Sequence, residues 1–298
     1  MRLYLGVFAL LATVHCEELF NGDQVLRIQA EYESHIEVLK ELEKNVDWGE
    51  LLDRERGVML HNAEMKSRAK GFNFAAYHNL EAIYSFMDTL VASHPDLISK
   101  VKIGSTYENR SMFALKFSTG GEKKPAIWID AGIHAREWVS HASAVWIADR
   151  IATDFKENRA PVPSLLSKMD IFLMIVANPD GYVFSHISPR PFHRLWRKSR
   201  SVTSNPNCPG VDLNRNWDAE FSGPGASDDP CGEDYRGPSA QSEIEVKNIA
   251  DFITSHGNFK SFMTLHAYSQ LLMYPYAYNG SNAPDQPELV KKSTSINL

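Results

Sequence analysis

The sequence predicts an α/β fold with a mixed, largely parallel central sheet and helices on both faces. Two apolar runs, Pro125–Ala131 and Asp170–Ala177, are nearly continuous, as is typical of strands buried on both faces of such a sheet. Between them, Ala142–Phe155 repeats its apolar residues at helical spacing, and strands that alternate with helices indicate a layered α/β domain. A length of 298 residues with 43% hydrophobic residues suffices for one large core and a smaller preceding segment.

The first residues have the pattern of a secretory signal peptide over residues 1–16. Arg2 precedes a short apolar block, Leu3–Val14, which is too short for a membrane anchor. We therefore expect a secreted protein. Its two remaining cysteines, Cys208 and Cys231, are then expected to form a disulfide, and two free buried thiols are the weaker alternative in an oxidising compartment.

Residues 17–70 are more charged and less strongly patterned than the chain that follows. A strand is predicted over Asp23–Gln29 and a helix over Tyr32–Lys44. We expect a domain boundary near residue 70, where Arg68 or Lys70 offers a cleavage site to a trypsin-like protease. The larger domain is then residues 71–298.

Beyond residue 70 the periodic segments become clearer. Residues 183–238 form a long irregular region that contains both cysteines, and such long loops are usually functional or crosslinked. Gly257 is placed to end the helix that precedes it. The expected elements are a helix within Ala75–Ser93, strands at Lys100–Ile103 and Phe113–Ser118, a turn at Asn178–Gly181, a helix over Ser239–Ser255 capped by Ser239, a strand that ends near His266, and a helix over Pro287–Ile296.

The corner after the first apolar run holds the best candidate for a metal site. His134 and Glu137 lie three residues apart at a strand-to-helix corner, where open α/β sheets bind their ligands. Zinc accepts such nitrogen and oxygen donors, and His266, at the end of another strand-like run, is a suitable third ligand. Taken alone, the first pair is better explained by a turn histidine and an acid at a helix N-terminus, and it is the neighbouring motifs that favour a metal site.

Arginines are gathered in the irregular region, although the chain as a whole has a formal net charge of −6. This charge gives no electrostatic reason to expect nucleic acid as a partner. The planar guanidinium of Arg215, with Asn214 beside it, suits the capture of a carboxylate. Lys198 and Arg200 are expected to be solvated. Asp212 is either a turn residue or the acceptor that fixes a histidine tautomer.

Two triplets, Asn109-Arg110-Ser111 and Asn279-Gly280-Ser281, fit the N-glycosylation sequence, although such triplets also occur by chance.

Taken together and in order, four motifs resemble those of the zinc metallocarboxypeptidases of the pancreatic carboxypeptidase A/B type. The resemblance runs from about Phe72 to the last residue, and residues 22–45 are similar to the start of that family's activation segment. The motifs are His134-Ala135-Arg136-Glu137-Trp138, Asn178-Pro179-Asp180-Gly181-Tyr182, Asp212-Leu213-Asn214-Arg215-Asn216-Trp217 and Leu265-His266-Ala267-Tyr268-Ser269-Gln270.

The resemblance implies a role for each matched residue. His134, Glu137 and His266 match the ligands of one zinc ion per chain, and Asp212 matches the carboxylate behind the first histidine. Arg197 matches the arginine that polarises the scissile carbonyl. Asn214 and Arg215 match the pair that binds the substrate's terminal carboxylate. The remaining matches are Arg136 and Tyr268 in more distant substrate subsites and a Cys208–Cys231 disulfide.

These matches imply a secreted zymogen that removes the C-terminal residue from peptides and is activated by a trypsin-like protease, with neither nucleic acid nor membrane as a partner. An A-type preference for apolar or aromatic end residues is favoured by Leu271, Leu272 and Met273. In the family, the general-base glutamate, a mobile tyrosine and most of the specificity pocket follow the point that corresponds to residue 298. The activation segment is also shorter than the family's, and an apparent insertion at Ser188–Pro191 can displace Arg197.

A second hypothesis is therefore a truncated form without catalytic activity that still binds zinc and peptides.

Overall fold

The computed structural model describes residues 71–121, 123–187, 191–268, 271–276, 281–284 and 286–287. The chain divides into two compact units, Met1–Ala76 and Tyr77–Leu298, and every element discussed below belongs to the second. The predicted signal peptide, the activation segment with its strand and helix, and all but the first residue of the helix over 287–296 lie outside the described residues. They stay predictions, as does the boundary near residue 70.

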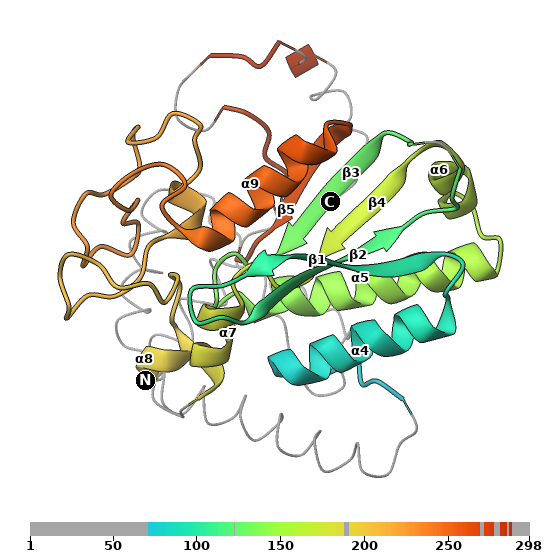
Figure 1. Ribbon diagram of the computed structural model, residues 1–298, viewed down its shortest axis with the longest axis horizontal. Helices are drawn as coiled ribbons and strands as arrows, with labels where there is room; N and C mark the ends of the chain where they lie inside the picture. Colours follow the sequence, from blue (N-terminus) through green and yellow to red (C-terminus); the bar gives the residue numbers. More distant parts are fainter. Residues whose placement is uncertain are drawn as a thin grey trace, which may run out of the picture. The chain divides into compact units, whose positions relative to one another are not determined.

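In the part of the chain that the structure describes, a five-stranded mixed sheet forms the centre of the second unit (Figure 1). Its strand order is β1-β2-β4-β3-β5. β3 pairs in parallel with both β4 and β5, whereas β1 with β2 and β2 with β4 are antiparallel. The strands are β1 (Ile98–Ser105), β2 (Ser111–Phe117), β3 (Ala126–Ala131), β4 (Asp170–Met174) and β5 (Phe259–Leu265). The predicted mixed α/β sheet is thus confirmed, and the two apolar runs are its inner strands β3 and β4.

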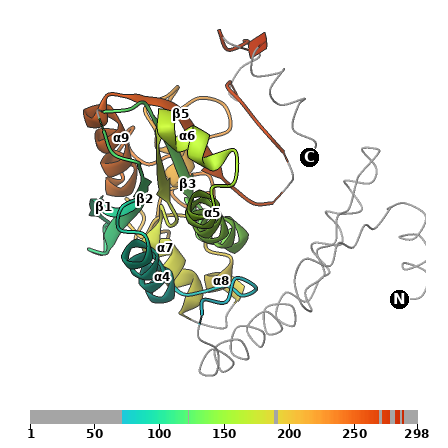
Figure 2. The ribbon, with the colours of Figure 1, turned by 90° about the vertical axis from the view of Figure 1, so that its right-hand side faces the viewer.

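Helices lie on both faces of this sheet, as predicted. α9 covers one face, and α4 and α5 cover the other (Figure 2). The described helices are α4 (Leu80–Ser93), α5 (Trp138–Lys156), α6 (Val162–Lys168), α7 (Pro179–His186), α8 (Pro191–Arg194), α9 (Ile244–His256) and a 3-10 turn, η1 (Leu213–Arg215). None of these helices combines the length and the apolar character needed to cross a bilayer.

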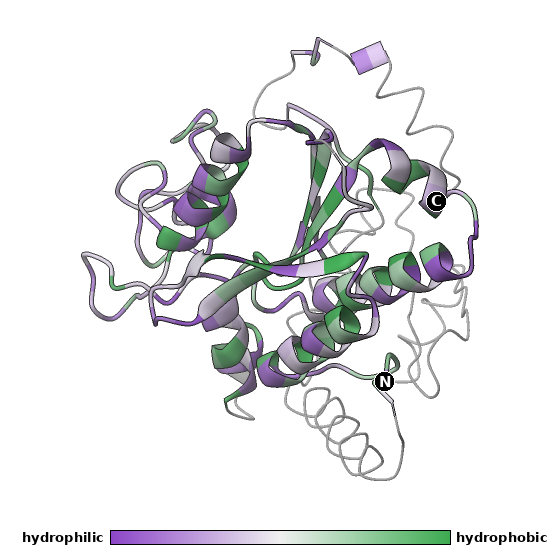
Figure 3. Ribbon diagram, turned by 45° about the vertical axis from the view of Figure 1, so that its right-hand side comes forward, coloured by the Kyte–Doolittle hydropathy of each residue, from purple (hydrophilic) through white to green (hydrophobic). Residues whose placement is uncertain are grey.

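Aromatic side chains form the core between the sheet and α9. The rings of Trp128 on β3 and Phe172 on β4 lie 5.8 Å and 5.6 Å from that of Phe252 on α9. Phe259, where β5 begins, packs edge-on against both strand residues. Burial of each large side chain contributes about 1.5–3 kcal/mol, so this cluster ties three strands and a helix together. Apolar residues accordingly concentrate on the inner strands and on the inward sides of the helices (Figure 3).

The predicted turn at Asn178–Gly181 is in fact the beginning of α7. The side-chain oxygen of Asn178 accepts a hydrogen bond of 2.9 Å from the Gly181 N–H, which makes Asn178 the N-cap. Pro179 follows in the first turn, where its missing N–H costs no hydrogen bond. Turns and N-caps use the same side-chain acceptors, which is why the motif indicated a turn.

α9 begins at Ile244, and its N-cap lies four residues after the predicted cap, Ser239. Its N-cap is Glu243, whose carboxylate is engaged elsewhere and accepts hydrogen bonds of 2.6 Å from the hydroxyls of Ser199 and Ser201. Its other end is as predicted, because Gly257 adopts a left-handed conformation with φ +69° and closes the helix. α4 likewise begins late, at Leu80, with Asn79 as its N-cap.

Glu245, in the first turn of α9, is buried with one oxygen unsatisfied. Oε1 accepts a hydrogen bond of 2.9 Å from the Tyr107 N–H, whereas Oε2 has no partner among the described residues. Burial raises the pKa of Glu245, and the negative charges of Glu243 and Asp180 add to the rise. The pKa reaches about 7 although the backbone N–H groups of Tyr107 and Glu245 oppose it. The folded protein therefore favours the protonated carboxyl group.

We expect the free energy of unfolding to fall as the pH rises from about 4.5 to 8, because Glu245 resists ionisation in the folded protein. The substitution Glu245→Gln should remove this pH dependence. A pKa of about 7 in the folded state lies above the ordinary value of 4.5. The stabilisation is therefore fully present below pH 4.5 and is lost as the pH rises through 7. The free energy of unfolding of the wild type should fall relative to Glu245→Gln by about 1–3 kcal/mol between pH 4.5 and 8. Urea denaturation at each pH measures this difference.

Glu81→Gln, an exposed change on α4, is the control and should follow the wild-type curve. Parallel curves for Glu245→Gln and the wild type would show that Glu245 does not titrate in this range.

Candidate metal centre and active site

The corner between β3 and α5 is tightly packed. Gly132 has φ +68°, and a Cβ atom at this position would lie 2.1 Å from Nε2 of His141, so the corner accepts only glycine here. The His141 ring is buried, stacks on Tyr182 and has its Nδ1 3.1 Å from the backbone oxygen of Glu137. His141 thus holds the backbone at Gly132 and Glu137 in place. No sequence motif indicated this role.

Three polar side chains converge in front of this corner. Nδ1 of His134 lies 2.6 Å from Oε1 of Glu137, and Nδ1 of His266 lies 3.0 Å from Oε2 of the same carboxylate. The two Nδ1 atoms are 3.1 Å apart. His134 and Glu137 are buried, whereas His266 is partly exposed. The structure therefore brings together the three residues that the sequence proposed as ligands.

The distant third residue arrives through the register of the sheet. β5 runs parallel to β3, and Ala131 is paired with Leu265. The chain therefore leaves both strands at the same edge, His134 three residues after Ala131 and His266 directly after Leu265. Hydrogen bonds between the two strands thus bring His266 to Glu137, although 129 residues separate them in the sequence.

Hydrogen bonds at the far side of each ring set the histidine tautomers. Nε2 of His134 lies 3.1 Å from Oδ1 of Asp212, a buried carboxylate. Nε2 of His266 lies 3.3 Å from the hydroxyl oxygen of Thr264, and that hydroxyl donates to Asp130 at 2.7 Å. Both acceptors place the ring proton on Nε2, so each Nδ1 presents a lone pair to the other and to Glu137.

This arrangement fits a cation. Burial raises the pKa of Glu137, but hydrogen bonds and positive charge from His134 and His266 outweigh burial and lower it to about 2, which requires an imidazole proton or a cation beside the carboxylate. Two nitrogen lone pairs and an anionic carboxylate cannot satisfy one another, because none of them carries a proton to share. A set of two imidazoles and one carboxylate is a common donor set of catalytic zinc.

Arg197 lies at the edge of this group in spite of the apparent insertion before it. Its Nε and Nη2 donate to Oδ2 of Asp212 at 3.0 Å and 2.8 Å, and its Nη1 lies 3.8 Å from Oε1 of Glu137. Burial raises the pKa of Asp212, but His134 and Arg197 lower it to about 2. One buried carboxylate therefore orients both a predicted ligand histidine and the predicted catalytic arginine.

In the segment after Arg197, Lys198 is buried and Arg200 is partly buried, which corrects the prediction that both are solvated. Lys198 is 4% exposed, and its ammonium donates to the backbone oxygens of Pro230 and Gly232 at 2.8 Å and 3.1 Å. Arg200 lies over the rings of Phe184 and Trp196. Both charges find partners far away in sequence, which local composition does not show.

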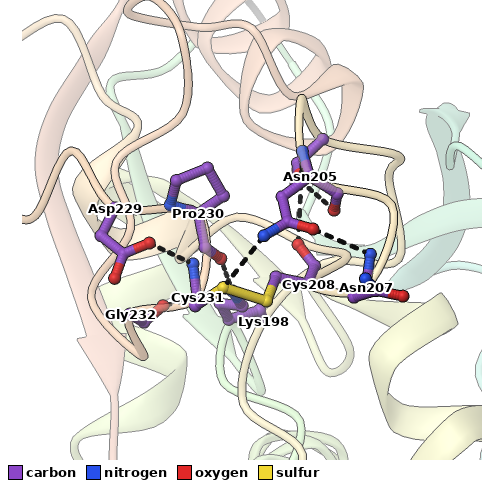
Figure 4. Close-up of a disulfide and its surroundings, with 9 residues drawn as sticks. Lys198, Asn205, Asn207, Cys208, Asp229, Pro230, Cys231 and Gly232 are labelled. Atoms are coloured by element: carbon purple, nitrogen blue, oxygen red, sulfur yellow. Dashed lines mark hydrogen bonds between the residues drawn. A yellow bond between two sulfur atoms is a disulfide. The ribbon is translucent and has the colours of Figure 1, made fainter.

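The predicted Cys208–Cys231 disulfide is present and lies beside these lysine contacts (Figure 4). Pro230 and Gly232, which accept from Lys198, are the two neighbours of Cys231. The backbone oxygen of Arg197 accepts a hydrogen bond of 3.2 Å from Ala135, the residue after His134. The disulfide loop is thus connected through Lys198 and Arg197 to the metal corner.

Asn214 and Arg215 are the last two residues of η1, whose N-cap is Asp212. The backbone N–H of Asn214 donates to Oδ1 of Asp212 at 2.9 Å, which fixes the start of this turn. The guanidinium of Arg215 donates to the backbone oxygens of Gly225 and Asn214 at 2.7 Å and 3.2 Å. These acceptors are neutral, so among the described residues no carboxylate compensates the charge of Arg215.

Arg136 and Tyr268 lie at the surface. Nη1 of Arg136 lies 3.0 Å from Glu233 and 3.3 Å from the backbone oxygen of Leu195, and Tyr268 is 95% exposed. Each is within two residues of a predicted ligand, yet the structure does not join them to the three converging side chains. The sequence did not identify Asp130 and Thr264, although a carboxylate inside an apolar strand was a visible signal.

The fold and this site define a single-metal centre at the carboxyl edge of a mixed α/β sheet, with arginines beside it. Comparisons with known proteins agree with that class. The family described as zinc carboxypeptidase matches residues 83–297. Carboxypeptidase A2 of Rattus norvegicus is 48% identical over 334 residues, which covers 97% of this chain and 78% of that protein.

Two further comparisons extend this result. Carboxypeptidase A4 of Mus musculus is 55% identical over 240 residues, covering 80% of this chain and 56% of that protein. The crystal structure of carboxypeptidase A from Helicoverpa armigera superposes with a TM-score of 0.73 at 23% identity, over 99% of this chain and 73% of that one, and this likeness shows the fold. The chain belongs to the zinc carboxypeptidase family, and zinc is its cofactor.

Asp212→Asn is expected to weaken zinc binding about 10- to 100-fold, because an amide in place of the carboxylate supports the His134 tautomer less well. Competition against a chromogenic chelator measures the zinc affinity. Asp218→Asn, an exposed change six residues on, is the matched control and should bind zinc like the wild type. Unchanged affinity in Asp212→Asn would mean that Asp212 does not support the ligand.

Lys198→Met is expected to destabilise the protein by about 1–3 kcal/mol, because two hydrogen bonds from a charged donor are lost. The destabilisation by Lys198→Met should be smaller in a protein whose Cys208 and Cys231 are both replaced by serine, since loss of the lysine and loss of the disulfide loosen the same loop. Thermal unfolding of the three variants and the wild type measures this coupling. Lys247→Met, whose side chain is 51% exposed, is the control. Simple additivity would rule out a shared loop.

Proposed function

We propose that this chain hydrolyses the C-terminal peptide bond of peptides that have a free carboxylate, with His134, Glu137 and His266 holding one Zn²⁺. The observation that carries the proposal is the convergence of ligand atoms of His134, Glu137 and His266 within 4.8 Å of one another. Arg215, in the turn that follows Asp212, adds a positive charge that no described carboxylate compensates. When bound, zinc supplies Lewis-acid polarisation of a carbonyl and lowers the pKa of coordinated water.

Arg215 and Asn214 are proposed to bind the terminal carboxylate of the substrate. The Arg215 guanidinium is held by two backbone oxygens, which fix its orientation without neutralising its charge. A planar fork fixed in this way recognises a carboxylate through paired charge-assisted hydrogen bonds. An enzyme that needs this anion for binding acts on the last residue and leaves internal peptide bonds intact.

Arg197 is proposed to stabilise the negative charge that develops on the scissile carbonyl oxygen. Its Nε and Nη2 are held by Asp212, whereas its Nη1 faces the metal group at 3.8 Å from Glu137. A donor that is fixed before the reaction stabilises such charge without reorganising. Arg136 and Tyr268, at the surface beside the ligands, are proposed to contact residues further from the scissile bond.

An A-type preference for apolar or aromatic C-terminal residues is supported by the curated relatives, which are carboxypeptidases A. Leu271, Leu272 and Met273, just beyond the third ligand, are apolar and exposed in the structure.

Secretion and activation by proteolysis are proposed from the N-terminal sequence. Residues 1–16 have the pattern of a signal peptide, and a trypsin-like protease is proposed to cut at Arg68 or Lys70 to release residues 71–298. The Cys208–Cys231 disulfide supports an oxidising compartment.

Arg215→Met is expected to lower kcat/KM on the order of 10- to 100-fold, chiefly through KM, because a charged contact to the substrate's end is lost. Release of phenylalanine from an N-acylated dipeptide measures this change. The same dipeptide as its C-terminal amide should resist the wild type, and a chelator should stop the reaction.

Arg159→Met, whose side chain is 52% exposed and lies in a surface ion pair, is the control and should leave kcat/KM unchanged. Equal turnover of the acid and the amide by the wild type would contradict the carboxylate clamp.

A further inference from the structure

The hairpin between β1 and β2 carries Asn109 at its tip, within the triplet Asn109-Arg110-Ser111. The tip is closed by backbone hydrogen bonds from Thr106 to Arg110 at 2.8 Å and from Asn109 to Thr106 at 2.9 Å. Asn109 is exposed and has φ 63°, a left-handed conformation that asparagine tolerates better than most residues. The hairpin is therefore ordered by its backbone and does not need the Asn109 side chain.

Alternate residues of the hairpin are anchored inward by one buried carboxylate. Asp180 accepts hydrogen bonds from the Thr106 hydroxyl at 2.6 Å, the Glu108 N–H at 2.7 Å and the Arg110 guanidinium at 2.8 Å. The carboxamide of Asn109, between two of these residues, makes no hydrogen bond to any residue that the structure describes. The side chain that the triplet would modify is thus the one left free in solvent.

The other two positions of the triplet also meet the requirement for N-glycosylation, which is a middle residue other than proline followed by a serine or threonine hydroxyl. Arg110 and the following Met112 are not proline, so the chain can present the asparagine and the hydroxyl together. Ser111 takes part in the fold through its backbone oxygen, which accepts from the Tyr84 hydroxyl at 2.6 Å. Its hydroxyl makes no hydrogen bond within the described part of the chain, so it is available to the transfer reaction.

From this geometry we infer that Asn109 is an N-glycosylation site of the secreted protein. In the reaction, Nδ2 of Asn109 forms a bond to C1 of the first sugar of a lipid-pyrophosphate-linked oligosaccharide. The bond between C1 and the phosphate oxygen breaks, Nδ2 loses one proton, and the lipid pyrophosphate leaves. The inference rests on the secretion proposed above, because the donor is met only in the secretory pathway.

The sheet topology places this glycan at the edge that also carries the metal centre. β2 runs antiparallel to β4, so its first residue, Ser111, lies at the edge where β3, β4 and β5 end. β4 alone separates β2 from β3, so their ends are roughly 10 Å apart. The glycan therefore extends from the same edge as the proposed active site, on the side away from β5.

To test this inference, the full chain is expressed in mammalian cells, once with its own residues 1–16 and once with an unrelated signal peptide in their place. The tryptic peptide that contains Asn109 is analysed by mass spectrometry, with and without peptide N-glycosidase in heavy-oxygen water. We expect a glycan on Asn109 that the enzyme removes, leaving labelled aspartate. Peptide-level analysis separates Asn109 from Asn279, which also fits the triplet.

Three variants sharpen the test. Asn109→Asp tolerates the left-handed conformation and removes the acceptor, and Ser111→Ala removes only the hydroxyl, so both should lose the glycan. Ser111→Thr keeps the triplet and should keep it. All three should unfold at the wild-type temperature after deglycosylation, because no described contact is lost.

An unmodified Asn109 in chains recovered from the medium overturns the inference, as does a glycan on Asn279 alone. A glycan on Asn109 that appears only with the unrelated signal peptide supports the inference and contradicts the proposed natural secretion. Retention of the glycan in Ser111→Ala would also overturn it, because the modification would then not depend on the triplet.

Discussion

The metal centre depends on the parallel pairing of β3 with β5. Two of the three converging side chains are neighbours in sequence, but the third is 129 residues away and reaches them only because Ala131 and Leu265 are paired. A shift of this register by one residue would turn every side chain of β5 to the opposite face. The hydrogen bonds between these strands therefore determine whether three electron-rich atoms meet, although without a cation those atoms repel one another.

Around this centre, two buried carboxylates orient the ligands by different routes. Asp212 contacts His134 directly, from a loop, whereas Asp130 acts on His266 through the hydroxyl of Thr264 on a neighbouring strand. Both routes place the ring proton on Nε2 and leave Nδ1 for the metal. The strand-borne route is rigid because of the sheet. The loop-borne route needs other support, which Arg197, Lys198 and the disulfide provide.

The sequence predicted those features that depend on local pattern. The inner strands, the end of α9 at Gly257 and the strand before His266 follow from apolar runs and turn residues that lie together in the chain. It proposed His134, Glu137 and His266 as ligands because their spacing and order are specific, and the structure places the three side chains together. It did not predict the burial of Lys198 or the partial burial of Arg200, because their partners, Pro230, Gly232 and the Phe184 ring, come from other segments.

Helix boundaries were missed for a related reason. Ser239 is a suitable N-cap by composition, but α9 begins only at Ile244, where Glu243 is fixed by Ser199 and Ser201. Those hydroxyls belong to the segment that carries Arg197. The start of a helix is thus set by the same polar network that holds the loop of the site, and no local rule includes that network.

The two arginines of the site differ in the groups that hold them, and this difference supports the separate roles proposed for them. Arg197 lies against Asp212 and near Glu137, so its position is fixed by carboxylates. Arg215 contacts only backbone oxygens in the described part of the chain. With a divalent ion in place, the charges of Glu137 and Asp212 balance that ion, and the two guanidinium groups remain as net positive charge. A substrate that brings its own carboxylate supplies the missing anion at Arg215, whereas an internal segment of a polypeptide does not. In the proposed mechanism, the preference for a free C-terminus therefore follows from the uncompensated charge of Arg215.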